Sequence, residues 1–142
     1  MAKKIKVFTD GGSRGNPGLA GAGFVVYDQT ESIIHQQAVF LGHKTNNEAE
    51  YLAFLEALEF LLRFELKHPG EITAASFFLD SKLVVEQINR RWKVKKSQLQ
   101  LLANKVWQNI EALPYSINVQ HVLRQHNALA DELANKAMDQ SI

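Results

Sequence analysis

The chain has 142 residues, of which 46% are hydrophobic and 22% are charged, a composition typical of one globular domain rather than of a disordered chain. It contains no cysteine, which excludes disulfide scaffolds, cysteine-ligated zinc and thiol catalysis. Its net charge of +1 gives, as an average, no support to a nucleic-acid partner. No apolar run reaches the ~20 residues of a membrane helix, so we expect a single cytoplasmic domain, residues 1–142, with no membrane partner.

The first part of the chain shows three strand patterns, at Ile5–Thr9, Ala20–Tyr27 and Ser32–Leu41. Turn residues fill Gly11–Gly18, between the first two strands. Connections this short join antiparallel neighbours. The pair Gly21-x-Gly23 does not match a dinucleotide-binding fingerprint, because it leads into a strand rather than into a helix.

A long helix is predicted over Asn46–Lys67, because Thr45 and Glu48 have the spacing of a capping box and Pro69 follows the pattern. The remaining elements follow in order as a strand at Ile72–Leu79, a helix from Ser81 to about Asn89, a helix from Ser97 to Leu113 with Ser97 and Gln100 in capping spacing, a strand at Ile117–Leu123 and a helix at Ala128–Met138. Three consecutive strands followed by strands that alternate with helices predict an α/β fold with one mixed sheet and helices on its faces.

The long helix carries two acidic residues that point in different directions. At ~100° per residue, Glu48 shares its face with Glu56 and Glu59, whereas Glu50 points toward the side of Phe54 and Leu61. An unpaired charge on a buried helix face is costly. We therefore interpret Glu48 as a cap and surface residue and Glu50 as a candidate functional residue.

Three further carboxylates lie at the ends of predicted elements. Asp10 and Asp80 each end an apolar strand pattern, and Asp131 lies in the first turn of the last helix. Taken singly, each is explained by turn or cap duty. Together with Glu50 they form an all-oxygen set that suits Mg²⁺ or Mn²⁺, and two such ions can clamp the attacking and leaving oxygens of a phosphoryl displacement.

Four sequence blocks resemble those of the ribonuclease H family, type 1, and they occur in that family's order. The blocks are FTDGGSRGNPG at Phe8–Gly18, TNNEAEYLA at Thr45–Ala53, LDSKLVVEQI at Leu79–Ile88 and RQHNALADELAN at Arg124–Asn135. The resemblance implies a ribonuclease H-like fold, a five-stranded mixed sheet whose first three strands are antiparallel. It also implies an endoribonuclease that cuts the RNA strand of RNA/DNA hybrids and leaves 3′-hydroxyl and 5′-phosphate ends.

The resemblance assigns roles residue by residue. Asp10, Glu50, Asp80 and Asp131 are implied to be the catalytic carboxylates, which bind two Mg²⁺ ions with Mn²⁺ as a substitute. Contacts to the backbone of the hybrid are implied for Gly11, Asn16, Thr45, Asn46 and Asn47. We expect a monomer without a small-molecule cofactor.

The run Arg90–Lys96 replaces the basic protrusion of longer family members, so the chain resembles the shorter subgroup. Five of its seven residues are cationic. Such a run is usually a solvated surface, but the aromatic Trp92 favours a hybrid-binding handle. We expect the substrate contacts of this handle from Trp92, Lys93 and Lys95.

The segment before Asp131 has the compact form R-x-x-N-x-x-A-D. Arg124 either contacts a phosphate or braces the loop, and Asn127 is expected to contact substrate or to cap the final helix. His126 is either an exposed loop residue or a group that assists catalysis.

Two alternative functions remain at this point. One is another nuclease of the same superfamily, against which the TNNEAEY block argues. The other is a non-catalytic module that binds hybrids or double-stranded RNA, against which the four mutually repelling carboxylates argue.

Overall fold

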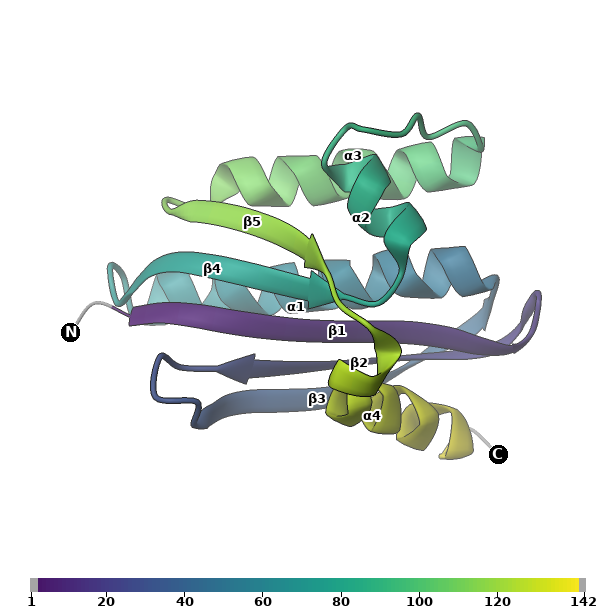
Figure 1. Cartoon of the computed structure of the whole chain (residues 1–142), viewed down its shortest axis with the longest axis horizontal. Coiled ribbons are helices and arrows are strands. Elements are labelled where there is room, and N and C mark those ends of the chain that lie inside the picture. Colours follow the sequence, from purple (N-terminus) through teal and green to yellow (C-terminus); the bar gives the residue numbers. More distant parts are fainter. Residues whose placement is uncertain (1–2, 141–142) are drawn as a thin grey trace.

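The computed structural model describes residues 3–140 as a five-stranded sheet with helices on both faces (Figure 1). The elements in chain order are β1 (Lys3–Gly15), β2 (Gly18–Tyr27), β3 (Ile33–Lys44), α1 (Asn46–Lys67), β4 (Ile72–Leu79), α2 (Lys82–Ile88), α3 (Ser97–Ala112), β5 (Ser116–His121), a 3₁₀ turn (Arg124–His126) and α4 (Ala128–Asp139).

The sheet has the strand order β3-β2-β1-β4-β5. β1 pairs antiparallel with β2 and β2 antiparallel with β3, whereas β4 pairs in parallel with both β1 and β5. The prediction of a mixed sheet whose first three strands are antiparallel is confirmed. This register places the carboxyl end of β4 beside Thr9, in the middle of β1, which continues to Gly15.

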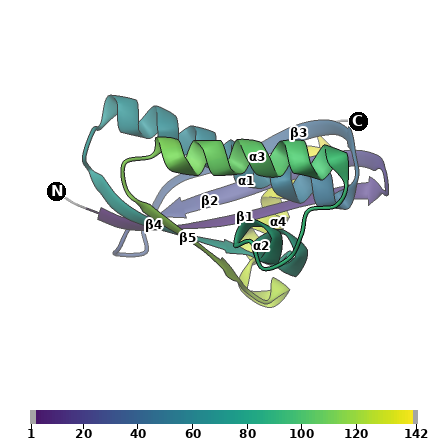
Figure 2. The same ribbon diagram turned by 90° about the horizontal axis from the view of Figure 1, so that it is seen from above.

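The helices cover the two faces of the sheet unequally. α1 and α3 lie together on one face, and α4 packs on the opposite face over β1, β2 and β3 (Figures 1 and 2). The core between the sheet and α1 contains Val7, Phe24, Phe54, Leu58 and Phe77, all fully buried. None of the helices within residues 3–140 is long and apolar enough to cross a membrane.

The predicted cap at the start of α1 is confirmed. The backbone N–H of Glu48 donates to the hydroxyl of Thr45 at 3.1 Å, and the backbone N–H of Thr45 donates to the Glu48 carboxylate at 2.9 Å. These two bonds satisfy donors that the helix start leaves free. The capping box fixes where α1 begins, and so which of its residues face the sheet.

Two local predictions were wrong. The turn expected over Gly11–Gly18 is confined to Asn16 and Pro17, because the glycines before it are extended and pair across the β1–β2 hairpin. Ser97 does not cap α3: Lys96 occupies the cap position without a side-chain hydrogen bond. The amide of Gln100 donates instead to the backbone oxygen of Val94 at 2.8 Å, away from the helix start.

Candidate active site

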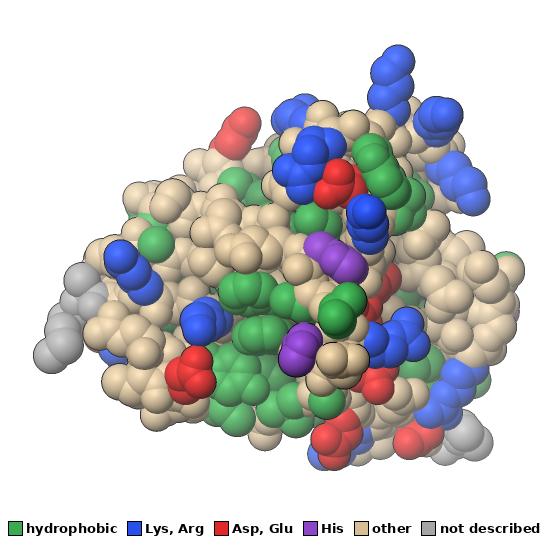
Figure 3. Space-filling view, viewed as in Figure 1, with side chains coloured by type: hydrophobic (Ala, Val, Ile, Leu, Met, Phe, Trp, Pro, Cys, Tyr) green, Lys and Arg blue, Asp and Glu red, His purple; other side chains and the backbone are tan. Residues whose placement is uncertain are grey.

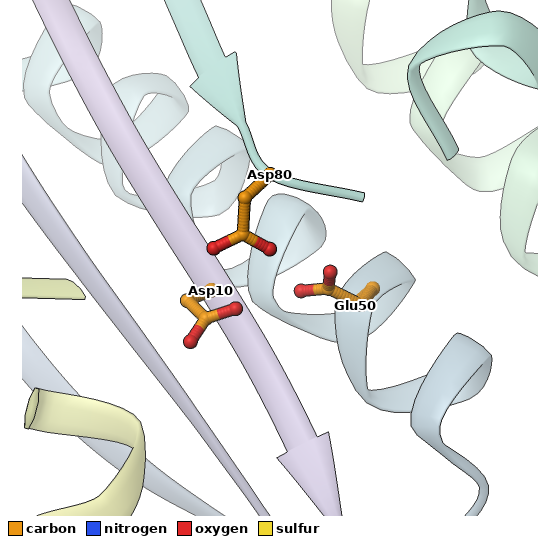
Figure 4. Close-up of side chains that lie close together, drawn as sticks. All are labelled: Asp10, Glu50 and Asp80. Atoms are coloured by element: carbon orange, nitrogen blue, oxygen red, sulfur yellow. The ribbon is translucent and has the colours of Figure 1, made fainter. Parts of the chain in front are cut away.

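Three acidic side chains from separate elements meet beside the carboxyl end of β4 and the middle of β1 (Figure 4). Asp10 lies in β1 and Asp80 directly follows β4, and the parallel pairing of Thr9 with Leu79 brings the two together. Glu50 comes from the first turns of α1. One oxygen atom from each of these carboxylates lies within 4.8 Å of the others. The structure therefore confirms that Glu50, and not Glu48, turns inward.

Gly11 allows β1 and α1 to approach closely enough for this meeting. A Cβ atom at Gly11 would lie 2.7 Å from the backbone nitrogen of Glu50 and closer still to the carbonyl of Ala49. The backbone N–H of Gly11 donates to the Glu50 carboxylate at 2.6 Å. Gly11 thus holds Glu50 by its backbone, which is a different role from the predicted contact with substrate.

The cluster is buried and its members repel one another. Asp10 is 7% exposed and Glu50 is 9% exposed. Burial, followed by the charge of Asp80 and by Asp131, raises the pKa of Asp10 from 3.8 to about 8. Burial, followed by the charges of Asp10 and Asp80, also raises the pKa of Glu50 well above its ordinary value.

Asp131 joins the same hollow from the opposite side. The hollow has a volume of about 480 Å³ and is lined by all four predicted carboxylates, from β1, α1, the end of β4 and α4. Asp131 stands in the first turn of α4 and is half-buried. Asp131 lies close enough to raise the pKa of Asp10. It does not belong to the tight three-carboxylate cluster found among residues 3–140.

Asn127 connects three of the segments that form the site. Its side-chain amide donates to the backbone oxygen of Thr9 at 2.9 Å and to the carboxylate of Asp80 at 3.1 Å. The prediction that Asn127 caps the final helix is confirmed for its position, since Asn127 is the N-cap residue of α4, but its side chain makes no capping hydrogen bond. The amide is directed into the sheet because Thr9 of β1 and Asp80 after β4 offer it two acceptors.

The donor set of this hollow fits a divalent metal. Three carboxylates with oxygen atoms within 4.8 Å of one another are hard oxygen ligands, the type that Mg²⁺ and Mn²⁺ prefer. The raised pKa values of Asp10 and Glu50 mean that the buried charges are uncompensated by the protein itself. A cation at this place relieves both the repulsion and the desolvation.

A second hollow lies beside the start of α1. It has a volume of about 160 Å³ and is lined by Asn16, Thr45, Asn47, Lys96, Gln98 and Leu99. The side-chain oxygen of Asn16 accepts from the backbone N–H of Asn46 at 3.1 Å, and the side-chain oxygen of Asn46 accepts from the backbone N–H of Ser13 at 2.9 Å. These bonds join the hairpin tip to α1. The predicted Asn16, Thr45 and Asn47 therefore do meet in space.

The basic segment Arg90–Lys96 forms the loop between α2 and α3, and Figure 3 shows Lys and Arg side chains gathered over it. Trp92 is 45% exposed. With Lys93 and Lys95 it lines a hollow of about 500 Å³ that also includes Asn47. Asn47 also borders the carboxylate hollow. The predicted handle is thus continuous with the carboxylate site.

A buried hydrogen-bonded chain anchors this loop to α1. The hydroxyl of Tyr51 donates to the side-chain oxygen of Gln87 at 2.7 Å, and the side-chain amide of Gln87 donates to the backbone oxygen of Lys93 at 3.2 Å. At the other end of the loop, the guanidinium of Arg90 lies 3.8 Å from the ring centre of Trp107. Tyr51 directly follows Glu50, so the loop is tied to the helix that carries the site.

Comparisons with known proteins identify the relationship of this chain. Residues 8–137 match a family described as "Reverse transcriptase-like". A ribonuclease H of Ruthia magnifica is 34% identical, over 96% of this chain and 96% of that protein. The chain belongs to the ribonuclease H family of enzymes. The resemblance inferred from the four sequence blocks is thereby confirmed.

Two further relatives refine this assignment to the ribonuclease H family. The solved structure of LC11-RNase H1, isolated from compost by a metagenomic approach, covers 97% of each chain with a TM-score of 0.90 and 38% identity. The same protein has been solved in complex with an RNA/DNA hybrid, at a TM-score of 0.90 and 36% identity. A bifunctional protein of Mycobacterium tuberculosis is 40% identical over 96% of this chain, but the chain spans only 36% of that relative's length.

In this member of the ribonuclease H family, the 3₁₀ turn carries two predicted site residues, Arg124 and His126, and they line different hollows. Arg124 is exposed and lines the carboxylate hollow. His126 is exposed and lines another hollow, of about 250 Å³, together with Lys6, Phe8 and Tyr27. The structure brings Arg124, but not His126, to the four carboxylates.

Several residues around the carboxylate site were not predicted from the sequence. Ser13, Arg14 and Asn135 line the carboxylate hollow, and Lys96 and Gln98 line the hollow beside α1. Lys96 belonged to the basic run, so its charge pattern was a usable signal. Arg14 and Asn135 lie within the first and last of the four sequence blocks, but the sequence does not show that they meet, because their contact depends on the packing of the β1–β2 hairpin against α4.

Proposed function

We propose that this chain is a divalent-metal-dependent endoribonuclease that cleaves the RNA strand of RNA/DNA hybrids. The observation that carries the proposal is the buried cluster of Asp10, Glu50 and Asp80, whose carboxylate oxygens lie within 4.8 Å of one another in an open hollow. Membership of the ribonuclease H family and the hybrid complex of LC11-RNase H1 support the choice of substrate.

The proposed mechanism uses the four carboxylates as ligands for two Mg²⁺ ions, with Mn²⁺ as a substitute. Two bound cations would neutralise the scissile phosphate and lower the pKa of the attacking water. Asp10, Glu50, Asp80 and Asp131 hold the required negative charge at one place, and Asn127 keeps the Asp80 carboxylate oriented. The products are RNA ends with a 3′-hydroxyl and a 5′-phosphate.

Substrate binding is proposed to follow a polar path across the molecule. The hollow beside α1, with Asn16, Thr45 and Asn47, supplies short polar groups suited to a sugar–phosphate backbone. The handle with Trp92 and its neighbouring lysines supplies charge and an aromatic surface. Contacts with the sugar–phosphate backbone do not read the base sequence, so we expect little sequence preference. Because they are partly electrostatic, we expect weaker binding at high salt.

One copy of the chain supplies all the proposed contacts with the metal ions and the hybrid. All four carboxylates, the hollow beside α1 and the handle come from a single domain and share Asn47 as a common border residue. We therefore propose that the domain acts as a monomer, with RNA distinguished from DNA by its 2′-hydroxyl groups.

The test is cleavage of end-labelled RNA/DNA hybrid, duplex RNA and duplex DNA in parallel, with Mg²⁺ or with EDTA. We expect cuts within the RNA strand of the hybrid only when Mg²⁺ is present. Tight hybrid binding without any cut would contradict the proposal and favour a binding module. Cutting of duplex DNA in preference to hybrid would favour a different nuclease. Glu59→Gln, on the exposed face of α1, serves as an active control.

A further inference from the structure

The glycines Gly21 and Gly23 of β2 lie directly under α4. In the sequence, these glycines did not match a dinucleotide-binding motif. The structure shows that they lie against the backbone of α4 instead. In the sheet, Gly23 is the direct partner of Asp10. α4 crosses β2 on the face opposite to α1, with its buried side facing these glycines (Figure 1). Because Gly23 has no side chain, α4 can lie close to β2 and therefore close to Asp10.

No side chain fits between Gly23 and α4. A Cβ atom at Gly23 would lie 2.6 Å from the Cβ of Leu133 and 2.7 Å from the backbone nitrogen of Ala134. It would lie closer still to the backbone oxygen of Ala130, in the peptide bond that leads into Asp131. Two of these three atoms belong to the backbone, so a side-chain rotation does not make room. Because β2 is paired with a strand on each side, we expect the helix rather than the strand to move.

α4 is held at both ends, so such a displacement falls on the part between them. Asn127 donates to Thr9 of β1 and to Asp80 after β4, just before α4 begins. Near its last turn, the guanidinium of Arg14 pairs with Asp139 at 2.6 Å. Asp131 lies in the first turn of α4, and the peptide bond that joins it to Ala130 is the one whose oxygen lies against Gly23.

We propose that Gly23 is a positioning residue: by having no side chain it sets the reach of Asp131 toward Asp10, and so the affinity of the site for divalent metal. This inference rests on the proposed function, since it gives Asp131 the role of a metal ligand. The expected size follows from the geometry. Ordinary contacts of a Cβ are about 1 Å longer than those found here, and a 1 Å misplacement at a catalytic site costs roughly 10²-fold in rate.

Gly21 provides a matched comparison on the same strand and under the same helix. A Cβ atom there would lie 2.5 Å from the backbone oxygen of Ala134, and 3.1 Å from the Cβ of Ala137. The obstruction is similar in kind, but it falls about one helical turn farther from Asp131. Gly21→Ala and Gly23→Ala are therefore expected to destabilise the fold comparably while affecting Asp131 differently.

The experiment measures Mn²⁺ affinity by calorimetry on the folded proteins without substrate, and kcat and KM on the hybrid with Mg²⁺. For Gly23→Ala we expect Mn²⁺ affinity to fall at least tenfold and kcat to fall about 10²-fold, with KM changed much less. For Gly21→Ala we expect both effects to be several-fold smaller. Adding Asp131→Glu to Gly23→Ala lengthens the ligand, and we expect it to restore part of the Mn²⁺ affinity.

Equal losses of metal affinity in the two glycine variants, or no recovery with Asp131→Glu, would overturn the inference. If circular dichroism shows that Gly23→Ala does not fold, the Mn²⁺ affinity is compared between Gly21→Ala with and without Asp131→Glu. The same changes in affinity are then expected, but smaller. Failure of the proposed function looks different: the unaltered chain then fails to cut hybrid. The comparison of Mn²⁺ affinities remains interpretable in that case.

Discussion

Replacing Asp10 by asparagine should change how the stability of the metal-free protein depends on pH. Burial and the neighbouring carboxylates raise the pKa of Asp10 from 3.8 to about 8. Between these two values the folded chain keeps a proton that the unfolded chain has released. The unfolded state is therefore increasingly favoured as the pH rises, and the stability present below the unfolded pKa is lost by the time the pH passes the folded pKa.

The size of this effect follows from linkage. Each retained proton lowers the free energy of unfolding by about 1.4 kcal/mol per pH unit within this range. Glu50 contributes in the same sense, because its pKa is also raised. Asp10→Asn removes one of these titrations and leaves the other groups in place. The difference between the two proteins should therefore widen in favour of the variant, by up to ~1.4 kcal/mol per pH unit from pH 5 to pH 7.

The assay is urea unfolding followed by circular dichroism in EDTA at pH 5, 6, 7 and 8. Glu59→Gln is the control, because this exposed carboxylate stands on the solvent face of α1. Parallel stability curves for Asp10→Asn and the unaltered chain would refute the assigned environment of Asp10. The same variant should bind hybrid but not cut it, since it lacks one carboxylate ligand. Retained cleavage would refute the role of Asp10 as a ligand.

Three further variants test other parts of the site. Trp92→Ala with Lys95→Ala should raise KM for the hybrid more than it lowers kcat; a larger loss in kcat would contradict a hybrid-binding handle. Asn127→Ala loses two hydrogen bonds in a buried position, so urea unfolding should show a loss of about 1–3 kcal/mol, and an unchanged stability would contradict the bracing role. Tyr51→Phe and Gln87→Leu break the same 2.7 Å bond, so their costs in stability should be less than additive; full additivity would show that the bond does not couple them.

The elements that carry the four carboxylates were predictable because each depends on local pattern. Helical periodicity separated Glu50 from Glu48, and the ends of two apolar sequence runs marked Asp10 and Asp80, although β1 itself continues past Asp10 to Gly15. These signals lie within a few residues of the group they identify. Burial of the charged group on an apolar face was the physical clue.

The parts that escaped prediction depend on contacts between distant segments. The amide of Asn127 finds one of its two acceptors at Thr9, 118 positions away in the chain. Likewise, the glycines of the hairpin looked like a turn, because a sequence does not show that a helix will lie against them. Ser97 met the local rule for a cap, but the chain enters α3 one residue earlier.

The origin of the four carboxylates in four separate elements bears on when the protein acquires activity during synthesis. Asp10, Glu50 and Asp80 can meet once β1, α1 and β4 have paired, but Asp131 arrives only when α4 docks on the hairpin. No short stretch of the chain holds more than one of these ligands. Under the proposed function, an emerging chain therefore lacks its fourth ligand until α4 has been made and has packed against β2.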